Sequence, residues 1–388
     1  MAGIYIHIPF CASRCKYCDF YSTTLLHRRE AYVQAVIREA EQRIHRENAM
    51  SCAAANDAQR DRKRPFHREK GKYQTVYLGG GTPSMLTEEQ IGRLTKAIGI
   101  RKGMEVTMEA NPGDLTREKL QALRKAGINR LSIGIQSFNN ELLQLIGRRH
   151  TAEEAEKAVR QAQETGFENI SIDLIYGLPT QTMSLWKEDI AKALALQVQH
   201  ISAYCLSYEN DTAITRMLQA GTIQAIDDET ENLMYETLVQ TLQHNGYEHY
   251  EVSNFCLPGY ESRHNSSYWD GTPYVGLGAA AHSYDGRKRR WNTADLEAYI
   301  DGIQRGEPIY EEETLTEDNR FNERIMLSLR TSKGLNLREL SEEDAAYCQE
   351  TAQPWLAKGL LRREGDRLVA SIAGSEILNS IIESFIRI

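Results

Sequence analysis

Three cysteines in one short loop constrain the fold of this chain more than any other sequence feature. Cys11, Cys15 and Cys18 follow a C-x3-C-x2-C spacing directly after the apolar stretch 4–8. These thiolates can bind one polynuclear centre only if the loop curls around it. An iron–sulfur cluster takes four ligands, usually Cys thiolates. With three protein ligands, one iron of a [4Fe–4S] cluster stays open to a small chelating molecule such as S-adenosylmethionine.

Two other interpretations of the three cysteines use the same residues. A zinc site could take His7 or Asp19 as its fourth ligand, since Cys3His is a common closed zinc set. Zinc fingers usually bring their ligands as two separated pairs, however, and here they form one run. Disulfides are disfavoured because the chain has seven Cys and no export signal.

Residues 5–11, Tyr-Ile-His-Ile-Pro-Phe-Cys, together with the cysteine spacing, resemble the radical S-adenosylmethionine proteins. Within them, the sequence is similar to the branch that holds the oxygen-independent coproporphyrinogen III dehydrogenases and the HemW-type haem chaperones. The resemblance covers nearly the whole chain. It implies a [4Fe–4S] cluster on Cys11, Cys15 and Cys18, with S-adenosylmethionine on the open iron.

The composition limits the class of protein. A formal net charge of −8 over 388 residues gives no general attraction to nucleic acid, so we expect no nucleic-acid partner. No run of 18 apolar residues occurs and the N-terminus leads directly into a strand, so we expect a soluble, cytoplasmic protein. The remaining cysteines have no Cys neighbour at ligand spacing and are predicted to be buried or surface thiols: Cys52, Cys205, Cys256 and Cys348.

Strand-like and helix-like segments alternate along the first half of the chain. The strand-like runs lie at residues 4–8, 75–78, 105–108, 130–135, 170–175 and 200–206, and helical stretches include 28–45, 116–126 and 151–165. Such alternation predicts a parallel sheet in an α/β fold. Six β/α units are too few for a closed eight-stranded barrel, so we predict a partial, open-sided (β/α)6 barrel of the radical S-adenosylmethionine type.

Residues 46–72 interrupt the alternation and contain a short basic run at 60–64. Their composition is typical of a solvated inserted loop. A nucleic-acid-binding patch is the alternative, and the acidic balance of the whole chain argues against it.

Polar residues stand where the predicted strands end, which is where ligands bind in parallel α/β sheets. Examples are the glycine run 79–81, Glu109, Gln136 and Asp173. Turn formation accounts for the glycines, but it explains Gln136 and Asp173 poorly, since each interrupts an apolar run. Consecutive glycines also let backbone groups approach a ligand without obstruction by a Cβ atom.

The resemblance assigns these residues to S-adenosylmethionine. It places Gly80, Gly81 and Thr82 at the methionyl end, Glu109, Gln136, Arg148 and Asp173 around the methionyl and ribose groups, and Tyr5 and Tyr17 along the cofactor. Arg148 suits a carboxylate because its planar fork donates two parallel hydrogen bonds. Its alternative role is a solvated charge at a helix end beside Arg149.

The segment 246–285 departs from the alternation and is rich in aromatic residues. Its hexapeptide 264–269, His-Asn-Ser-Ser-Tyr-Trp, resembles the H-N-x-x-Y-W motif associated with haem binding in HemW-type chaperones. Imidazole is a common haem ligand and aromatic faces suit a porphyrin, so His264 is the candidate ligand. The alternative is a packed corner in which His264 only hydrogen-bonds the backbone. His249, His282 and Cys256 are further candidates.

Acidic residues outnumber basic ones from residue 311 onwards. Helical patterns at 317–329 and 342–358, a hairpin at 360–369 and a last helix resemble a winged-helix-like α+β domain. We therefore expect a barrel over 1–245, a family-specific extension over 246–310 and a C-terminal domain over 311–388. The acidity of this last part favours a lid or docking role over DNA binding.

Two departures distinguish between the members of the family. The dehydrogenases carry a fourth Cys where this chain has Phe20, and they carry an N-terminal extension, whereas Cys11 here lies near residue 1. The resemblance therefore implies a haem chaperone that delivers haem to respiratory proteins, with an electron donor such as a flavodoxin or ferredoxin and a possible homodimer. The alternatives are a coproporphyrinogen III dehydrogenase and a zinc-built interaction module.

Overall fold

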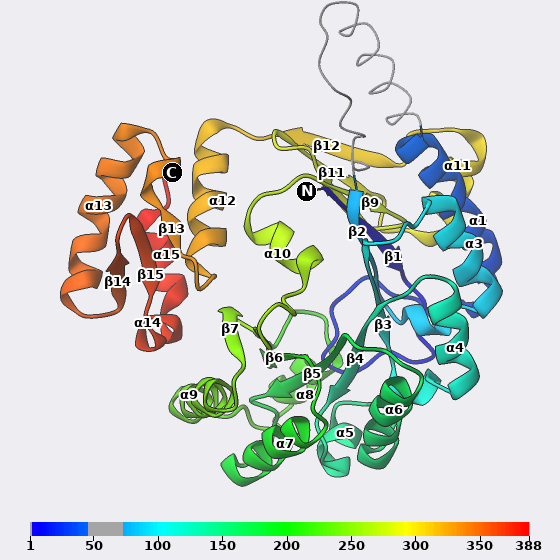
Figure 1. Ribbon diagram of the computed structural model, residues 1–388, viewed down its shortest axis with the longest axis horizontal. Coiled ribbons are helices and arrows are strands. Elements are labelled where there is room, and N and C mark those ends of the chain that lie inside the picture. Colours follow the sequence, from blue (N-terminus) through cyan, green and yellow to red (C-terminus); the bar gives the residue numbers. More distant parts are fainter. Residues whose placement is uncertain (1, 46–72, 388) are drawn as a thin grey trace, which may run out of the picture.

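A curved, twelve-stranded mixed sheet forms the centre of the molecule. The computed structural model describes residues 2–45 and 73–387, and its large sheet has the order β12-β11-β10-β9-β1-β2-β3-β4-β5-β6-β8-β7. Strands β1 to β6 run parallel in sequence order and curve into part of a barrel (Figure 1). Their bounds are β1 (Ala2–Ile8), β2 (Tyr73–Gly80), β3 (Glu105–Ala110), β4 (Arg130–Gln136), β5 (Ile170–Tyr176) and β6 (His200–Cys205). The predicted partial (β/α)6 barrel is confirmed.

Helices cover the outer side of this sheet (Figure 1). They are α1 (Arg29–Ala40), α3 (Glu88–Ile98), α4 (Arg117–Lys125), α6 (Ala152–Glu164), α7 (Met183–Ala195) and α9 (Asp228–His244). Two shorter helices, α5 (Asn140–Leu145) and α8 (Ala213–Gln219), belong to a separate apolar cluster beside the cysteine loop. Threonine caps fix several starting points: Thr116 accepts a hydrogen bond from the Lys119 amide, and Thr151 forms a capping box with Glu154. The helices predicted at 116–126 and 151–165 are therefore confirmed, with these threonines just outside them.

The two faces of the barrel strands differ in chemistry. The outward-facing side chains, such as Val76, Val106 and Leu131, are fully buried under the helices. The alternate positions face the barrel interior and are polar, although strands of a parallel sheet are commonly apolar on both faces. Tyr77 of β2 bonds Glu109 of β3 there. Polar side chains inside a barrel require partners or ligands, so this interior is where the function is to be sought.

Further strands extend the sheet at both edges. Beside β6 lie β8 (Asn254–Cys256) and β7 (Glu248–Glu251), both antiparallel to their neighbours. Beside β1 lies β9 (Tyr274–Leu277), which is parallel to β1 and is followed by the antiparallel strands β10 (His282–Tyr284), β11 (Lys288–Asn292) and β12 (Tyr310–Thr314). Helix α10 (Arg263–Trp269) lies between the barrel and the C-terminal part, and α11 (Leu296–Arg305) lies beside α1 (Figure 1).

The C-terminal part is a small domain with its own core. Its three-stranded antiparallel sheet has the order β13-β15-β14. The elements are α12 (Glu317–Leu329), β13 (Leu335–Asn336), α13 (Glu342–Ala357), β14 (Leu361–Glu364), β15 (Arg367–Ala370), α14 (Ile372–Glu376) and α15 (Leu378–Phe385). Ile325, Ile381 and Phe385 are fully buried in its core. The predicted helices and hairpin are confirmed, with the turn at Gly365 and Asp366.

Two predictions about the organisation of the chain remain predictions. The loop 46–72, including Cys52, lies outside the described residues. The boundaries at 245/246 and 310/311 are not tested, although β12 begins at Tyr310 and pairs with β11 in the large sheet. No helix in the described part of the chain has both the length and the apolar character needed to cross a bilayer.

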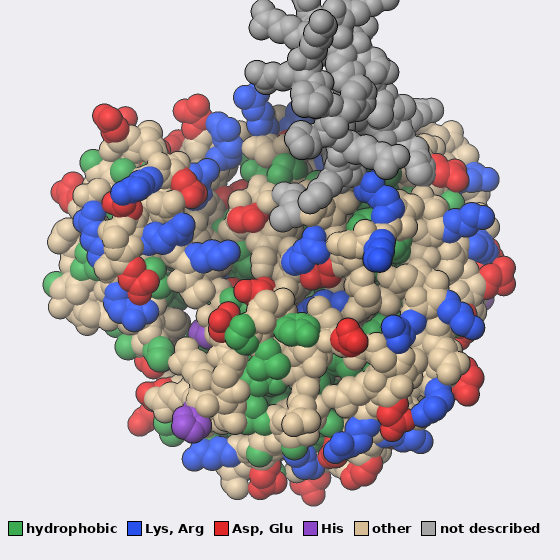
Figure 2. All heavy atoms as spheres, viewed as in Figure 1, with side chains coloured by type: hydrophobic (Ala, Val, Ile, Leu, Met, Phe, Trp, Pro, Cys, Tyr) green, Lys and Arg blue, Asp and Glu red, His purple; other side chains and the backbone are tan. Residues whose placement is uncertain are grey.

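Lys and Arg side chains are interspersed with Asp and Glu over the face seen in Figure 2.

Candidate functional site

The cysteine loop is fixed at the carboxyl end of β1. Its two ends close on each other, because the Cys11 amide donates to the Thr23 carbonyl at 2.9 Å and the Thr23 amide donates to the Pro9 carbonyl at 2.6 Å. The middle of the loop is held from both sides at Lys16. The Lys16 amide donates to the Ile146 carbonyl after α5, at 3.0 Å, and the Lys16 carbonyl accepts from the Ile214 amide of α8, at 2.8 Å. The loop therefore curls in the way that the cysteine spacing predicts.

The donor set of this loop fits an iron–sulfur cluster. The backbone of Gly81 lies so close that a Cβ atom there would be 3.0 Å from the Cys11 sulfur, and the Thr82 hydroxyl donates to that sulfur at 3.5 Å. Burial raises the pKa of the Cys18 thiol to about 11, so Cys18 is a thiol in the bare loop and a bound metal centre would favour its thiolate. Within residues 2–45 and 73–387, no group of three or more His, Cys, Asp or Glu side chains is placed so that it could hold a single metal ion. A cluster binds each cysteine through a different iron and needs no such convergence.

The histidine considered as a zinc ligand is already occupied. His7 is buried, its Nε2 donates to the Tyr21 carbonyl at 2.9 Å, and its Nδ1 accepts from the Tyr5 hydroxyl at 3.0 Å. Both ring nitrogens are therefore engaged. Asp19, the other candidate, has an exposed side chain.

Glu109 lies inside the barrel next to the glycine run. Its two carboxylate oxygens accept from the Tyr77 hydroxyl at 2.9 Å and from the Gly80 amide at 3.1 Å. Desolvation by burial raises the pKa of Glu109 to about 7 in spite of these two donors. A carboxylate has about four lone-pair sites, so Glu109 keeps acceptor capacity for a cationic ligand group.

Arg148 reaches from the loop after α5 to the cysteine loop. Its Nη1 donates to the Cys15 sulfur at 3.4 Å and its Nη2 donates to the Gly134 carbonyl, while its buried Nε has no partner. Arg149 is exposed and pairs with Asp114 at 3.4 Å. The alternative of a solvated helix-end charge therefore describes Arg149 and not Arg148.

The remaining predicted residues lie around the same end of the barrel. Asp173 of β5 accepts from the Ser132 hydroxyl at 3.1 Å, and burial raises its pKa. Gln136 ends β4 with a positive φ of 71°, a conformation that few residues other than glycine adopt. Tyr17 packs against the apolar cluster that includes Ile146 and Ile214, and Tyr5 stacks on Tyr77 with ring centroids 6.3 Å apart.

His264 lies elsewhere, at the amino ends of the barrel strands. Its side chain is 1% exposed, and its Nδ1 and Nε2 are hydrogen-bonded to the Thr75 and Tyr268 hydroxyls at 2.8 and 2.9 Å. Burial, with the nearby Arg130 charge, lowers the pKa of His264 to about 3, so the ring is neutral. This is the packed arrangement weighed against haem ligation, except that the partners are side chains. Ligation by His264 would require both bonds to open.

Sequence reasoning missed Tyr77, which joins these two places. Its hydroxyl contacts Glu109, and its ring stacks on His264 with centroids 5.2 Å apart and planes 23° apart. The sequence position of Tyr77 could have indicated this role, because Tyr77 precedes Gly79 by two residues in β2 and so faces the same side of the sheet. Among the other cysteines that the structure describes, Cys256 and Cys348 are buried and Cys205 is exposed, all as free thiols.

Comparison with known proteins agrees with this geometry. Residues 5–193 match the Radical SAM superfamily, and residues 315–376 match the HemN C-terminal domain. The solved coproporphyrinogen III oxidase (HemN) of Escherichia coli, described as a radical SAM enzyme, has a TM-score of 0.79. It is 23% identical over 99% of this chain and 89% of its own, which shows a shared fold.

The similarity to curated relatives extends over almost the full length. The haem chaperone HemW of Lactococcus lactis subsp. lactis (strain IL1403) is 35% identical, and the match covers 98% of this chain and 96% of that protein. HemW of Bacillus subtilis (strain 168) is 34% identical over 100% and 99%, and HemW of Escherichia coli (strain K12) is 30% identical over 99% and 98%. The chain therefore belongs to the HemW haem chaperone family, a branch of the Radical SAM superfamily.

Proposed function

We propose that this chain is a haem chaperone that binds a [4Fe–4S] cluster, S-adenosylmethionine and haem, and that it hands haem to haem-requiring respiratory proteins. The observation that carries the proposal is the full-length similarity to HemW chaperones, which includes both the cysteine loop and the aromatic segment. Phe20, two residues after Cys18, adds support because the dehydrogenases have a fourth Cys there.

The cofactors would occupy the carboxyl end of the barrel. Cys11, Cys15 and Cys18 would bind three irons, with Thr82 and Arg148 donating hydrogen bonds to two of the sulfurs. S-adenosylmethionine would lie among Tyr5, Tyr17, Gly80, Gly81, Glu109, Gln136, Arg148 and Asp173. The bound cluster supplies an electron at this end of the barrel, and the chain supplies position and exclusion of water.

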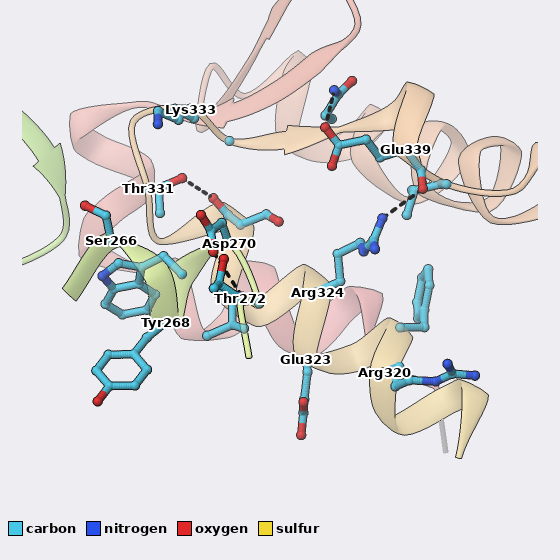
Figure 3. A pocket seen from close by; sticks show the side chains of 18 of the residues that line it. Ser266, Tyr268, Asp270, Thr272, Arg320, Glu323, Arg324, Thr331, Lys333 and Glu339 are labelled. Carbon is cyan, nitrogen blue, oxygen red and sulfur yellow. Dashed lines mark hydrogen bonds between the residues drawn. The ribbon is translucent and has the colours of Figure 1, made fainter. Parts of the chain in front are cut away.

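The haem site we propose is a cavity between α10 and the C-terminal domain. It has a volume of about 1600 Å³, and its walls include Tyr268 and Trp269 from α10 and Phe321, Arg320 and Arg324 from α12 (Figure 3). Aromatic faces suit a porphyrin, and guanidinium groups suit its propionates. The volume exceeds the roughly 300–1,000 Å³ of ordinary small-molecule sites, so a tetrapyrrole has room there.

The position of this cavity supports a carrier role over a radical reaction on haem. Helix α10 contacts β1 and β2 at Gly3 and Thr75, near their amino ends, whereas the cysteine loop follows the carboxyl end of β1. Haem in this cavity would therefore lie at the opposite end of the strands from the cluster. A substrate attacked by a cluster-derived radical has to lie beside the cofactor instead.

The haem ligand is a separate proposal. His264 remains the motif-based candidate, and His249 is the second, because His249 lines the cavity. Replacement of each by alanine in haem titrations distinguishes them. The variant that changes the Soret band identifies the ligand.

The test of the whole proposal is anaerobic reconstitution with iron and sulfide, followed by haem titration of the same sample. We expect iron and labile sulfide in equal amounts, lost in the Cys11→Ala, Cys15→Ala and Cys18→Ala variants and kept in the Cys205→Ala control. We also expect a Soret shift with haem. Conversion of coproporphyrinogen III to protoporphyrinogen IX would indicate the dehydrogenase instead, and zinc without labile sulfide would indicate an interaction module.

The cellular setting belongs to the same proposal. We place the protein in the cytoplasm, with a flavodoxin or ferredoxin as electron donor and a homodimer as its assembled form. Size measurement with and without the reconstituted cluster tests the dimer, because a cofactor that favours the assembled state shifts it by mass action.

A further inference from the structure

A continuous set of contacts inside the barrel connects helix α10 to Glu109. It begins at the amino end of the strands with His264, passes through the ring of Tyr77, and ends at the Glu109 carboxylate and the Gly80 amide. These groups belong to β2, β3 and α10. Tyr77 contacts both His264 and Glu109.

His264 is held rigidly at the start of this set. Both ring nitrogens are hydrogen-bonded, at 2.8 Å to Thr75 and 2.9 Å to Tyr268. The helix that carries it is anchored too, because Glu105 of β3 accepts from the Arg263 amide at 3.0 Å and the His264 amide at 2.9 Å. The imidazole therefore has a fixed plane.

The strand next to it leaves room for the imidazole. At Gly3 in β1, a Cβ atom would lie 2.9 Å from His264 Nδ1, closer than real Cβ atoms come. A side chain at position 3 would push the ring off Tyr77. Glycine at position 3 therefore leaves the space that the His264 ring occupies.

Tyr77 is held between two rings. The centroid of the His264 ring lies 5.2 Å from that of Tyr77, with 23° between the ring planes. The centroid of the Tyr5 ring lies 6.3 Å from that of Tyr77, with 25° between the planes. A tyrosine fixed in this way points its hydroxyl at one place. That place is the Glu109 carboxylate, 2.9 Å away.

We propose that His264 is a positioning residue for the S-adenosylmethionine site, acting through Tyr77 on Glu109. The Tyr77 hydroxyl and the Gly80 amide each donate to one Glu109 oxygen and so fix the carboxylate beside the glycine run, with further lone pairs left to accept. An ammonium group bound at Glu109 then meets an acceptor that is already oriented. In this role, the histidine of the H-N-x-x-Y-W hexapeptide acts on the cofactor end of the barrel through Tyr77.

The inference rests on the S-adenosylmethionine site proposed above, and the test separates the two. Equilibrium dialysis of reconstituted protein with labelled S-adenosylmethionine gives the dissociation constant for each variant. If the unchanged protein fails to bind, the proposed site itself fails. If it binds and the variants bind equally well, only the role of His264 fails.

Four variants define the expected result. Tyr77→Phe keeps the ring and removes the bond to Glu109, and we expect binding about tenfold weaker, as for the loss of one hydrogen bond to a charged group. We expect His264→Ala to weaken binding by about three- to tenfold. His264→Phe restores a ring against Tyr77, so it should bind within about threefold of the unchanged protein. The double variant should bind no more weakly than Tyr77→Phe alone, because both act through one bond.

His200→Ala is the matched control. His200 is also 1% exposed, and its ring nitrogens are hydrogen-bonded at 2.7 Å to Ser171 and to Tyr250, but it does not stack on Tyr77. We expect unchanged S-adenosylmethionine binding with a comparable loss of thermal stability. Equal weakening by His200→Ala, or additive effects of the Tyr77 and His264 changes, would overturn the inference.

The electron paramagnetic resonance spectrum of the reduced cluster gives a second readout that stability alone does not move. The spectrum of the unchanged protein should change at a lower concentration of S-adenosylmethionine than the spectrum of the Tyr77→Phe variant does. Tyr77→Phe keeps the ring packing, so it also serves as the test if His264→Ala fails to fold. Identical titration midpoints contradict the proposal. A His264→Ala protein with normal cofactor binding but no Soret shift would make His264 the haem ligand.

Discussion

Burial controls the charge of Glu109. Desolvation raises the pKa of this carboxyl from its usual 4.5 to about 7, against the opposing effect of the Tyr77 hydroxyl. A neighbouring cation favours the charged form of a carboxyl group, so a bound ammonium group would lower this pKa again. Glu109 is therefore poised to exchange a proton for a cationic ligand near neutral pH.

Glu109→Gln tests this charge in the protein without cofactors. Because the folded-state pKa lies above the unfolded one, the stability that Glu109 contributes is complete below about pH 4.5 and is lost as the pH rises through about 7. From pH 5 to 8 we expect the unchanged protein to lose about 2–3 kcal/mol more unfolding free energy than Glu109→Gln. Urea denaturation at both pH values measures the difference. Parallel pH profiles would mean that Glu109 stays ionised throughout.

Arg148 and Arg149 offer a comparison between neighbouring side chains of the same type. Arg148 donates to the Cys15 sulfur at 3.4 Å, and Arg149 pairs with the surface carboxylate of Asp114. Hydrogen bonds to cluster sulfurs stabilise the more negative, reduced state. The reduction potential should therefore depend on one arginine and not on the other.

Arg148→Lys should make the cluster harder to reduce. Lysine lacks the planar fork that reaches Cys15 and Gly134 together. If the lost bond is worth about 0.5–1.5 kcal/mol more in the reduced state, the potential falls by about 20–60 mV. A redox titration followed by electron paramagnetic resonance measures it. Arg149→Lys is the control, and an equal shift in that variant would assign the effect to overall charge.

At the scale of elements, one buried carboxylate joins α1 to the far edge of the sheet. Glu39 accepts from the Gly278 amide at 2.9 Å, from Asn292 Nδ2 at 2.9 Å and from the Tyr299 hydroxyl at 2.7 Å. Arg43 completes the set at 3.0 Å. These donors lie just after β9, at the end of β11, in the first turn of α11 and in the π-helix Glu41–His45 that follows α1, so the Glu39 side chain connects α1 to all of them.

Glu39→Ala should therefore destabilise the whole barrel. It leaves several buried donors without an acceptor, and we expect a loss of about 3–5 kcal/mol in unfolding free energy. Glu41 is exposed and lies two residues further along the chain, so Glu41→Ala should change the free energy of unfolding by less than about 0.5 kcal/mol. Chemical denaturation of the two variants provides the comparison. A small effect of Glu39→Ala would mean that water replaces the carboxylate.

Local pattern predicted the barrel strands, and long-range pairing was not predictable. The residues 317–329 form α12 as expected, and the structure adds a capping box between Thr316 and Asn319 at its start, with Asn in place of the usual Glu or Gln. The parallel pairing of β9 with β1 joins residues about 270 apart in sequence, and no local periodicity encodes it. The strand-end rule located Glu109, the next-to-last residue of β3, whereas Asp173 lies in the middle of β5 and stood out only because it interrupts an apolar run. The rule could not locate Tyr77, whose role depends on a histidine from α10.

At the scale of the molecule, α10 lies between the two proposed ligand sites. One of its side chains, Tyr268, lines the cavity beside the C-terminal domain and bonds His264, which stacks on Tyr77. Tyr77 in turn bonds Glu109 at the cofactor end. A ligand that shifts Tyr268 therefore changes the same set of contacts that orients Glu109.

Haem and S-adenosylmethionine should consequently influence each other's binding. Coupling between two sites is reciprocal, so the factor by which haem changes the dissociation constant of S-adenosylmethionine must equal the converse factor. We expect a factor of about 5 or more, within the range usual for coupled sites, in protein with an intact cluster. Dialysis of one ligand at saturating and zero concentrations of the other measures both factors.

Tyr77→Phe identifies the route of this coupling. The substitution leaves the cavity wall and the cysteine loop unchanged and removes only the hydroxyl that reaches Glu109. If coupling passes through the barrel interior, the factor should fall toward 1 while haem affinity without S-adenosylmethionine stays as it was. A coupling factor that survives in Tyr77→Phe would show that the two sites communicate by another path, such as movement of the C-terminal domain against α10.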